Sequence, residues 1–224
     1  MSEVVQRIEI GRIFSAATTD IGRDMMRFGS LAASIGLFGG VIDTYAPRAG
    51  NIAGNIALFV ASLLAVYYTL LAHMPDAGIK PRFGAAFGFN LLTGLGIIVG
   101  LVFLIVPGVM LFTRWAVGLP ALLREDLTAW QAMDRSAVLT MGNRWRILGL
   151  GLLIWMPFLI VMVAVGGLSA AFAGEESLDS LIFNIIVNLA AGSATILSSV
   201  CWSHAYLTLS HEDESGQSLA QIFA

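Results

Sequence analysis

The chain alternates between long apolar stretches and short polar connections. A helix that crosses a bilayer needs about 20 mostly apolar residues, because the hydrocarbon core is about 30 Å thick and each helical residue rises about 1.5 Å. Five stretches meet this requirement: residues 28–45, 52–73, 83–106, 147–172 and 178–209. A sixth, residues 108–123, is shorter and contains Arg114. The pattern predicts an all-α protein, a polytopic transmembrane helical bundle of about six spans.

Two of these stretches meet at Pro107-Gly108. As one helix, residues 83–123 would extend about 60 Å, which is twice the thickness of the hydrocarbon core. Proline removes a backbone donor and glycine admits positive φ, so this pair can end and turn a helix. We therefore expect a hairpin that turns at Pro107-Gly108, with its two arms as separate spans.

The basic residues favour an arrangement with both termini in the cytoplasm. With six spans, most of them fall on the inner side, in agreement with the positive-inside rule. They are Arg7, Arg12, Arg23, Arg27, Lys80, Arg82, Arg124, Arg135, Arg144 and Arg146, while the outer connections hold only Arg48. The expected parts are a cytoplasmic amphipathic segment (1–27), the membrane domain (28–209) and a cytoplasmic acidic tail (210–224). No cleaved signal peptide is expected, because charged residues interrupt the first segment.

One amphipathic helix is predicted outside the spans, over residues 127–141 in the cytoplasmic connection between spans four and five. Thr128 and Gln131 have the spacing of a capping box, and Gly142 is a natural stop. The expected apolar face consists of Trp130, Met133, Ala137 and Met141. Such a helix lies on the inner leaflet or against the bundle.

Composition supports lipid as the main solvent. The chain is 57% hydrophobic and only 12% charged, whereas soluble domains carry about 25% charged residues. The net charge of -3 does not indicate a nucleic-acid partner. The basic residues other than Lys80 are all arginine, which we interpret as the bias of a GC-rich bacterial genome. The expected location is the bacterial inner membrane.

A few polar side chains fall inside the apolar stretches. Arg114 is costly at mid-span unless it finds a partner, and Asp43 is one candidate. In the last span, Asn184 and Asn188 begin a polar stripe that continues through Thr195 and Ser199. Two interpretations stay open: a buried ligand site or polar path, and hydrogen bonds that hold helices together.

Common catalytic and metal-binding motifs are missing from the sequence. It contains no GxSxG, GxxxxGK[ST], HExxH, CxxC or EF-hand pattern. His73, His204 and His211 do not have the spacing of metal ligands, and Cys201 is the single cysteine. We therefore expect no enzymatic activity, no metal and no cofactor.

A run of short motifs lies within residues 106–148. It consists of Pro107-Gly108, Arg114-Trp115, Pro120-Ala121, Glu125, Ala132 with Ser136, and Arg144-Trp145. This run resembles the membrane domain of glycerophosphoryl diester phosphodiesterases and of related bacterial inner-membrane families. The catalytic barrel of those enzymes is a separate soluble domain, for which we expect no room beside six spans. The resemblance implies a polytopic module that acts as a scaffold or handles lipid.

The same region carries the expected lipid contacts. Arginines near the inner leaflet attract anionic lipids, and tryptophans favour the headgroup level. The candidates are Arg124, Arg135, Arg144, Arg146 and Trp145. Glu125 and Asp134 are expected to pair with these arginines and orient the surface helix.

Three functions follow from these patterns. The first is a non-enzymatic scaffold or lipid-interacting module, whose partners are membrane lipids and another membrane protein or a second copy of the chain. The second is a small transporter or channel built on Arg114 and the polar face of the last span, which would require a polar cavity. The third is an intramembrane lipid-processing enzyme, which would require converging titratable groups near Arg114.

Overall fold

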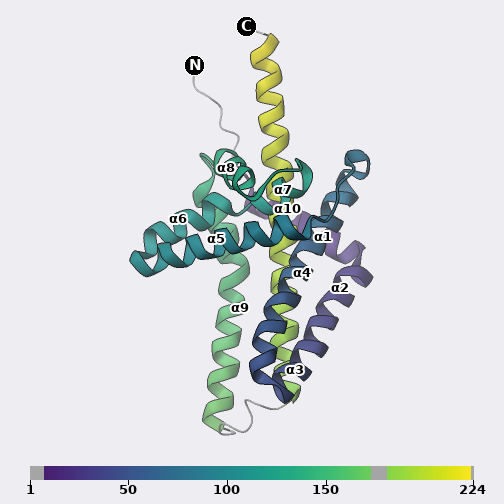
Figure 1. Cartoon of the computed structure of the whole chain (residues 1–224), viewed down its shortest axis with the longest axis vertical. Coiled ribbons are helices and arrows are strands. Elements are labelled where there is room, and N and C mark those ends of the chain that lie inside the picture. Colours follow the sequence, from purple (N-terminus) through teal and green to yellow (C-terminus); the bar gives the residue numbers. More distant parts are fainter. Residues whose placement is uncertain (1–7, 173–180, 223–224) are drawn as a thin grey trace. The chain divides into compact units, whose positions relative to one another are not determined.

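The computed structural model describes residues 8–172 and 181–222, and every regular element in these residues is helical (Figure 1). The α-helices are α1 (Ile10–Arg23), α2 (Met25–Ser34), α3 (Gly40–Tyr45), α4 (Pro47–His73), α5 (Phe83–Phe103), α6 (Ile105–Trp115), α7 (Gly118–Arg124), α8 (Ala129–Leu139), α9 (Arg144–Phe172) and α10 (Leu181–Ile222). A π-helical turn, η1 (Ile35–Gly39), joins α2 to α3, and a 3-10 turn, η2 (Pro75–Ala77), follows α4. The all-α prediction is confirmed for this part of the chain.

Within the described residues, six helical segments are long and apolar enough to cross a membrane. They are Met25–Tyr45, Pro47–His73, Phe83–Phe103, Ile105–Arg124, Arg144–Ala164 and Leu181–His211. Many of their large apolar side chains, such as Phe38, Val163 and Ile182, are exposed. Such faces are stable against hydrocarbon and unstable against water. The chain therefore has the build of a multi-pass integral membrane protein, as the sequence predicted.

The helices form two compact units. Unit 1 comprises residues 1–17, 66–150 and 200–224, and unit 2 comprises residues 18–65 and 151–199. Four of the described helices, α1, α4, α9 and α10, contribute one end to each unit.

In unit 1, α5 and α6 form a tight antiparallel hairpin (Figure 1). A Cβ atom at Gly100 would lie 2.9 Å from the Cα atom of Gly108, and the ring of Trp115 packs against Gly96. The chain reverses at Leu104, whose extended backbone (φ -163°, ψ 137°) separates the two helices. Small residues thus let the two arms approach closely.

The prediction that the hairpin turns at Pro107-Gly108 is wrong in position. Pro107 lies in the first turn of α6, where its missing N–H would have no helical acceptor in any case. Gly108 supplies the close contact with α5 instead of the turn. The second arm also differs from prediction, because a turn after Trp115 separates α6 from α7.

The capping box that precedes α8 is confirmed. The Thr128 Oγ1 atom accepts from the Gln131 backbone N–H at 3.5 Å, and the Gln131 Oε1 atom accepts from the Thr128 backbone N–H at 2.9 Å. Two donors at the helix start therefore have partners. The helix itself is shorter than the predicted residues 127–141.

Replacing Thr128 by alanine is expected to remove this cap. A lost threonine cap costs about 1 kcal/mol, so the thermal unfolding midpoint of the detergent-solubilised protein should fall. The Thr128→Ser variant keeps the hydroxyl and serves as the control. Equal midpoints for Thr128→Ala and Thr128→Ser would contradict the assigned role of the hydroxyl.

In unit 2, the α2–η1–α3 segment packs against α10 through glycines. A Cβ atom at Gly36 would lie 2.9 Å from the Leu189 Cβ atom, and one at Gly40 would lie 2.6 Å from the Ile185 backbone. The π-helical turn falls at this contact, which brings Gly36, Gly39 and Gly40 to the buried side. The close contact between the backbones of these helices, and not the packing of large side chains, thus holds this part of unit 2 together.

The last candidate span ends at His211, close to the expected start of the acidic tail at residue 210. Helix α10 continues without a break beyond this point to Ile222. The predicted N-terminal segment holds a helix, α1, which buries Ile13 and Ala17.

Candidate functional site

Glu125, at the end of α7, is the centre of a polar cluster in unit 1. The Arg135 Nε atom donates to both carboxylate oxygens, at 3.0 and 3.1 Å, and the Tyr206 hydroxyl donates to Oε1 at 2.8 Å. The side chains of Arg135 and Glu125 are 24% and 22% exposed. The ion pair is therefore largely removed from water and is stronger than a surface pair.

A second arginine completes this cluster. The Arg124 Nη1 atom donates to the Tyr206 hydroxyl at 3.3 Å, and its Nε atom lies 3.0 Å from the Met74 sulfur. Tyr206 of α10 is fully buried. Its hydroxyl accepts from Arg124 and donates to Glu125, so it links these two charged side chains. The cluster joins α7, α8 and α10 through groups that satisfy one another.

Asp126, the residue after Glu125, forms a more exposed ion pair with Arg82. Asp126 accepts from the Arg82 Nη1 atom at 2.8 Å, but its side chain is 84% exposed. Its backbone is in the left-handed region (φ 54°), which aspartate and asparagine tolerate better than most residues. The Arg82 Nη1 atom also donates to the Leu127 carbonyl at 2.9 Å, which fixes the connection from α7 to α8.

The residues of the family-like run have packing roles in unit 1. The Ser136 Oγ atom donates to the Arg114 carbonyl at 2.8 Å, so α8 is bonded to the end of α6. Pro120 is fully buried within α7. The Arg114 side chain is exposed, so only its backbone takes part in this contact. Asp43, its predicted partner, belongs to unit 2.

The four arginines proposed as lipid contacts differ in their surroundings. Arg124 and Arg135 belong to the Glu125 cluster, and the Arg146 Nη1 atom donates to the Ile8 carbonyl at 2.6 Å. Arg144 is the exception: its Nε atom is buried and, within the described residues, has no hydrogen-bond acceptor. A buried donor of this kind calls for an acceptor beyond the described residues, such as water, an ion or a lipid headgroup.

Trp145 stands beside Arg144 and is 85% exposed. Trp130 and Val138 of α8 are also exposed, and so is Met141, which lies two residues after the end of α8. The predicted apolar face of this helix is therefore wrong in part. Met133 and Ala137 face the protein, whereas Trp130 and Met141 face away from it.

In unit 2, the predicted polar stripe of the last span takes part in contacts between helices. The Asn188 Nδ2 atom donates to the Asp43 Oδ2 atom at 2.8 Å, and the Asn184 Nδ2 atom donates to the Thr44 hydroxyl at 3.0 Å. Further along, the hydroxyls of Ser62 and Ser199 lie 2.9 Å apart. These contacts favour the packing interpretation of the stripe.

Unit 2 also contains an apolar groove of about 440 Å³ between the α2–η1–α3 segment and α4. Its lining residues are Leu31, Ser34, Ile35, Phe38, Gly39, Ile42, Ala53, Gly54, Ile56, Ala57, Val60 and Ala61. The only hydroxyl among them, that of Ser34, donates to the Ser30 carbonyl of its own helix. A polar transport path would need groups that replace water around its cargo, and this groove offers none.

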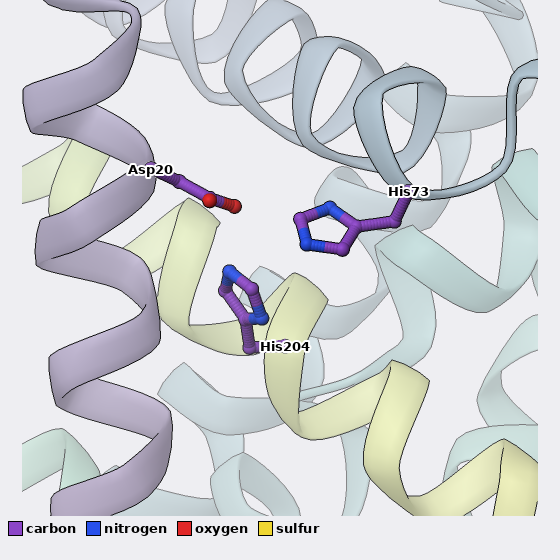
Figure 2. A group of neighbouring side chains, drawn as sticks. All are labelled: Asp20, His73 and His204. Carbon is purple, nitrogen blue, oxygen red and sulfur yellow. The ribbon is translucent and has the colours of Figure 1, made fainter.

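Two histidines of unit 1, His73 and His204, lie together, which their spacing in the sequence did not indicate. The rings of His73 and His204 meet edge to face with centroids 4.9 Å apart, and His73 Nδ1 lies 3.0 Å from the Thr69 carbonyl (Figure 2). Asp20, which Figure 2 also draws, belongs to unit 2. Two imidazoles are fewer than the about four ligands of a structural zinc centre, so this pair by itself is not a metal site.

Comparisons of the chain with protein-family models, with curated proteins and with solved structures gave no match. The resemblance to the membrane domain of the phosphodiesterases therefore stays a prediction. What the chain does must be argued from its own residues.

Proposed function

We propose that the chain is a non-enzymatic inner-membrane module that binds anionic lipid headgroups at the start of α9. The Arg144-Trp145 step carries this proposal. The buried Nε atom of Arg144 donates to no described protein group. The neighbouring Trp145 is almost fully exposed. A lipid phosphate is an acceptor suited to arginine, and tryptophan favours the depth at which phosphates lie.

The surroundings of this step support lipid as the ligand. Trp130 of α8 and Met141, which follows α8, are each 64% exposed and provide an apolar surface that acyl chains can cover. The Glu125 cluster fixes α8, and Arg146 ties the start of α9 to Ile8. The surface is therefore held in place before lipid arrives, which lowers the entropic cost of binding. The family resemblance, which implies a scaffold or lipid-handling module of the bacterial inner membrane with cytoplasmic termini, agrees with this role.

The alternative functions lack a comparable observation. Asn184 and Asn188 bond to Thr44 and Asp43, which accounts for them without a transport path. An enzyme would need titratable groups aimed at a substrate, whereas Glu125, Arg135 and Tyr206 bond to one another. Lipid binding at Arg144 is therefore the function that the geometry supports best.

The lipid that copurifies with the protein tests this proposal. Wild-type protein extracted in mild detergent should retain phosphatidylglycerol in preference to phosphatidylethanolamine, as measured by mass spectrometry. Replacing Arg144 by Gln and Trp145 by Ala should lower this preference about tenfold, because a charge-assisted bond and an aromatic contact are lost.

Arg48→Gln is the matched control, because Arg48 is an exposed arginine of unit 2. It removes the same charge and should leave the lipid ratio unchanged. An unchanged ratio in the Arg144→Gln, Trp145→Ala protein would overturn the proposal. Equal losses in both proteins would overturn it as well, because they would indicate a non-specific effect of charge.

A further inference from the structure

The apolar groove of unit 2 has the length of one acyl chain. Its lining residues extend from Leu31 to Ile42 on the α2–η1–α3 segment and from Ala53 to Ala61 on α4. These two arms run side by side (Figure 1). The first arm of the groove is about 16 Å long, at about 1.5 Å for each residue. This is about half the thickness of the hydrocarbon core and hence the depth of a single leaflet.

The width of the groove also indicates a single chain. Its volume of about 440 Å³, spread over that length, gives a mean cross-section of roughly 28 Å². A helix with its side chains is about 10–12 Å across and needs about three times this area. Carbon atoms in contact lie about 3.5–4.0 Å apart, so one extended hydrocarbon chain fits between the walls. The occupant that matches this shape is therefore a lipid chain and not a helix of a second copy.

The walls of the groove are suited to hydrocarbon. Ile35 and Ala61 are buried and form the floor, whereas Phe38 and Ile56 are exposed and form the rims. A Cβ atom at Gly54, which also lines the groove, would meet nothing within 4 Å. Walls without a partner lose dispersion contacts, and an acyl chain in the groove would restore them.

A pair of opposite charges lies at the Leu31 end of the groove. Arg27 precedes Leu31 by four residues and Ser34 by seven, which is the spacing of one face of α2. The Arg27 Nη1 atom donates to the Asp24 Oδ2 atom at 3.1 Å, and their side chains are 60% and 44% exposed. An exposed pair of this kind contributes little to stability, so both charges can turn to a ligand.

The charges around this end are balanced in sign. Residues 18–30 hold two acids and two bases, which are Asp20, Arg23, Asp24 and Arg27. A zwitterionic phospholipid offers the complementary pair, a phosphate for arginine and an ammonium for aspartate. A headgroup that carries only negative charge would place it beside the carboxylate of Asp24, which disfavours such a lipid.

We propose that this groove binds one acyl chain of a zwitterionic phospholipid of the phosphatidylethanolamine type, with its phosphate at Arg27 and its ammonium at Asp24. The groove belongs to unit 2 and Arg144 to unit 1. The start of α9 differs in charge, because residues 141–150 contain two arginines and no acid. The two sites therefore select different headgroups, and this inference does not rest on lipid binding at Arg144.

Photo-crosslinking in vesicles tests the groove. The full chain is reconstituted with phosphatidylethanolamine that carries a diazirine in the middle of one acyl chain, and adducts are mapped by peptide mass spectrometry. Phosphatidylglycerol with the same modified chain is the comparison probe. Leu91 of α5 and Ile160 of α9 are exposed apolar positions outside the groove and report ordinary contact with lipid.

The proposal predicts that the ethanolamine probe forms at least about fivefold more adducts on the groove residues than around Leu91 or Ile160, because a bound chain stays beside the same side chains. Ala57→Phe fills the groove and should lower the groove adducts about fivefold. Ala49→Phe is the matched control, because Ala49 is an exposed residue of α4 outside the groove. Arg27→Gln should lower the groove adducts as well, because the phosphate loses a charged donor.

The distribution of adducts on the wild-type protein decides the question without any variant. Equal labelling of the groove and the two outside positions would overturn the proposal, since the groove would then be solvated like any other face. Equal groove labelling by the glycerol probe would overturn the assigned headgroup. Ala57→Phe protein that elutes as a single species and keeps the wild-type groove adducts would contradict the placement of the chain.

Discussion

Replacing Glu125 by glutamine is expected to lower the free energy of unfolding by about 2–3 kcal/mol, because Arg135 in a largely buried cluster loses its counter-charge. Arg135 donates to both oxygens of this carboxylate, and Tyr206 donates to one of them. Glutamine keeps the shape and one acceptor but not the charge. For a chain of this size the unfolding midpoint should fall by about 5–10 °C, measured by fluorescence-detected size exclusion after heating in detergent.

The neighbouring carboxylate provides the control for this experiment. Asp126 also pairs with an arginine, Arg82, but its side chain is 84% exposed. Exposed pairs contribute less than about 1 kcal/mol, and asparagine tolerates the left-handed backbone at this position. Asp126→Asn should therefore shift the midpoint little. Equal shifts for the two variants would contradict the assignment of Glu125 to a buried cluster.

Adding one methyl group at Gly40 is expected to destabilise unit 2 by about 1–3 kcal/mol. The new Cβ atom would lie 2.6 Å from the backbone nitrogen and Cα of Ile185, and backbone atoms cannot rotate away as a side chain can. The α3–α10 contact must then separate, which also pulls Asp43 and Thr44 from their asparagine partners. The unfolding midpoint in detergent is again the measurement.

Gly29→Ala is the matched control, because Gly29 lies in neighbouring α2 and a Cβ atom there would meet nothing within 4 Å. Alanine favours a helix over glycine by up to about 1 kcal/mol, so this variant should be neutral or more stable. A Gly40→Ala protein as stable as Gly29→Ala would show that α3 and α10 do not pack as closely as described.

The sequence predicted those features that depend on local patterns. Apolar stretches identified the six candidate segments, because length and hydropathy are properties of neighbouring residues. The capping box of Thr128 and Gln131 was predicted for the same reason, since its two members are three residues apart. A pairing of Glu125 with one of the nearby arginines was also expected, because opposite charges lie close together in this part of the sequence, and Arg135 is that partner.

Features that depend on distant residues could not be predicted. Tyr206 completes the Glu125 cluster from 81 residues away, and nothing in its own neighbourhood marks it for this role. The polar stripe of the last span was visible, but its partners Asp43 and Thr44 were not. The turn of the hairpin was misplaced because proline ends a helix as readily as it begins one, and only the packing of Gly108 on Gly100 decides between them.

The central claim is that hydrocarbon, not water, surrounds the apolar faces of these helices. Alkaline carbonate extraction of membranes from cells that express the full chain tests it most directly, because carbonate strips peripheral proteins and leaves integral ones. The account predicts that the protein stays in the membrane pellet and is released only by detergent. Release by carbonate as a monodisperse species in aqueous buffer would contradict it.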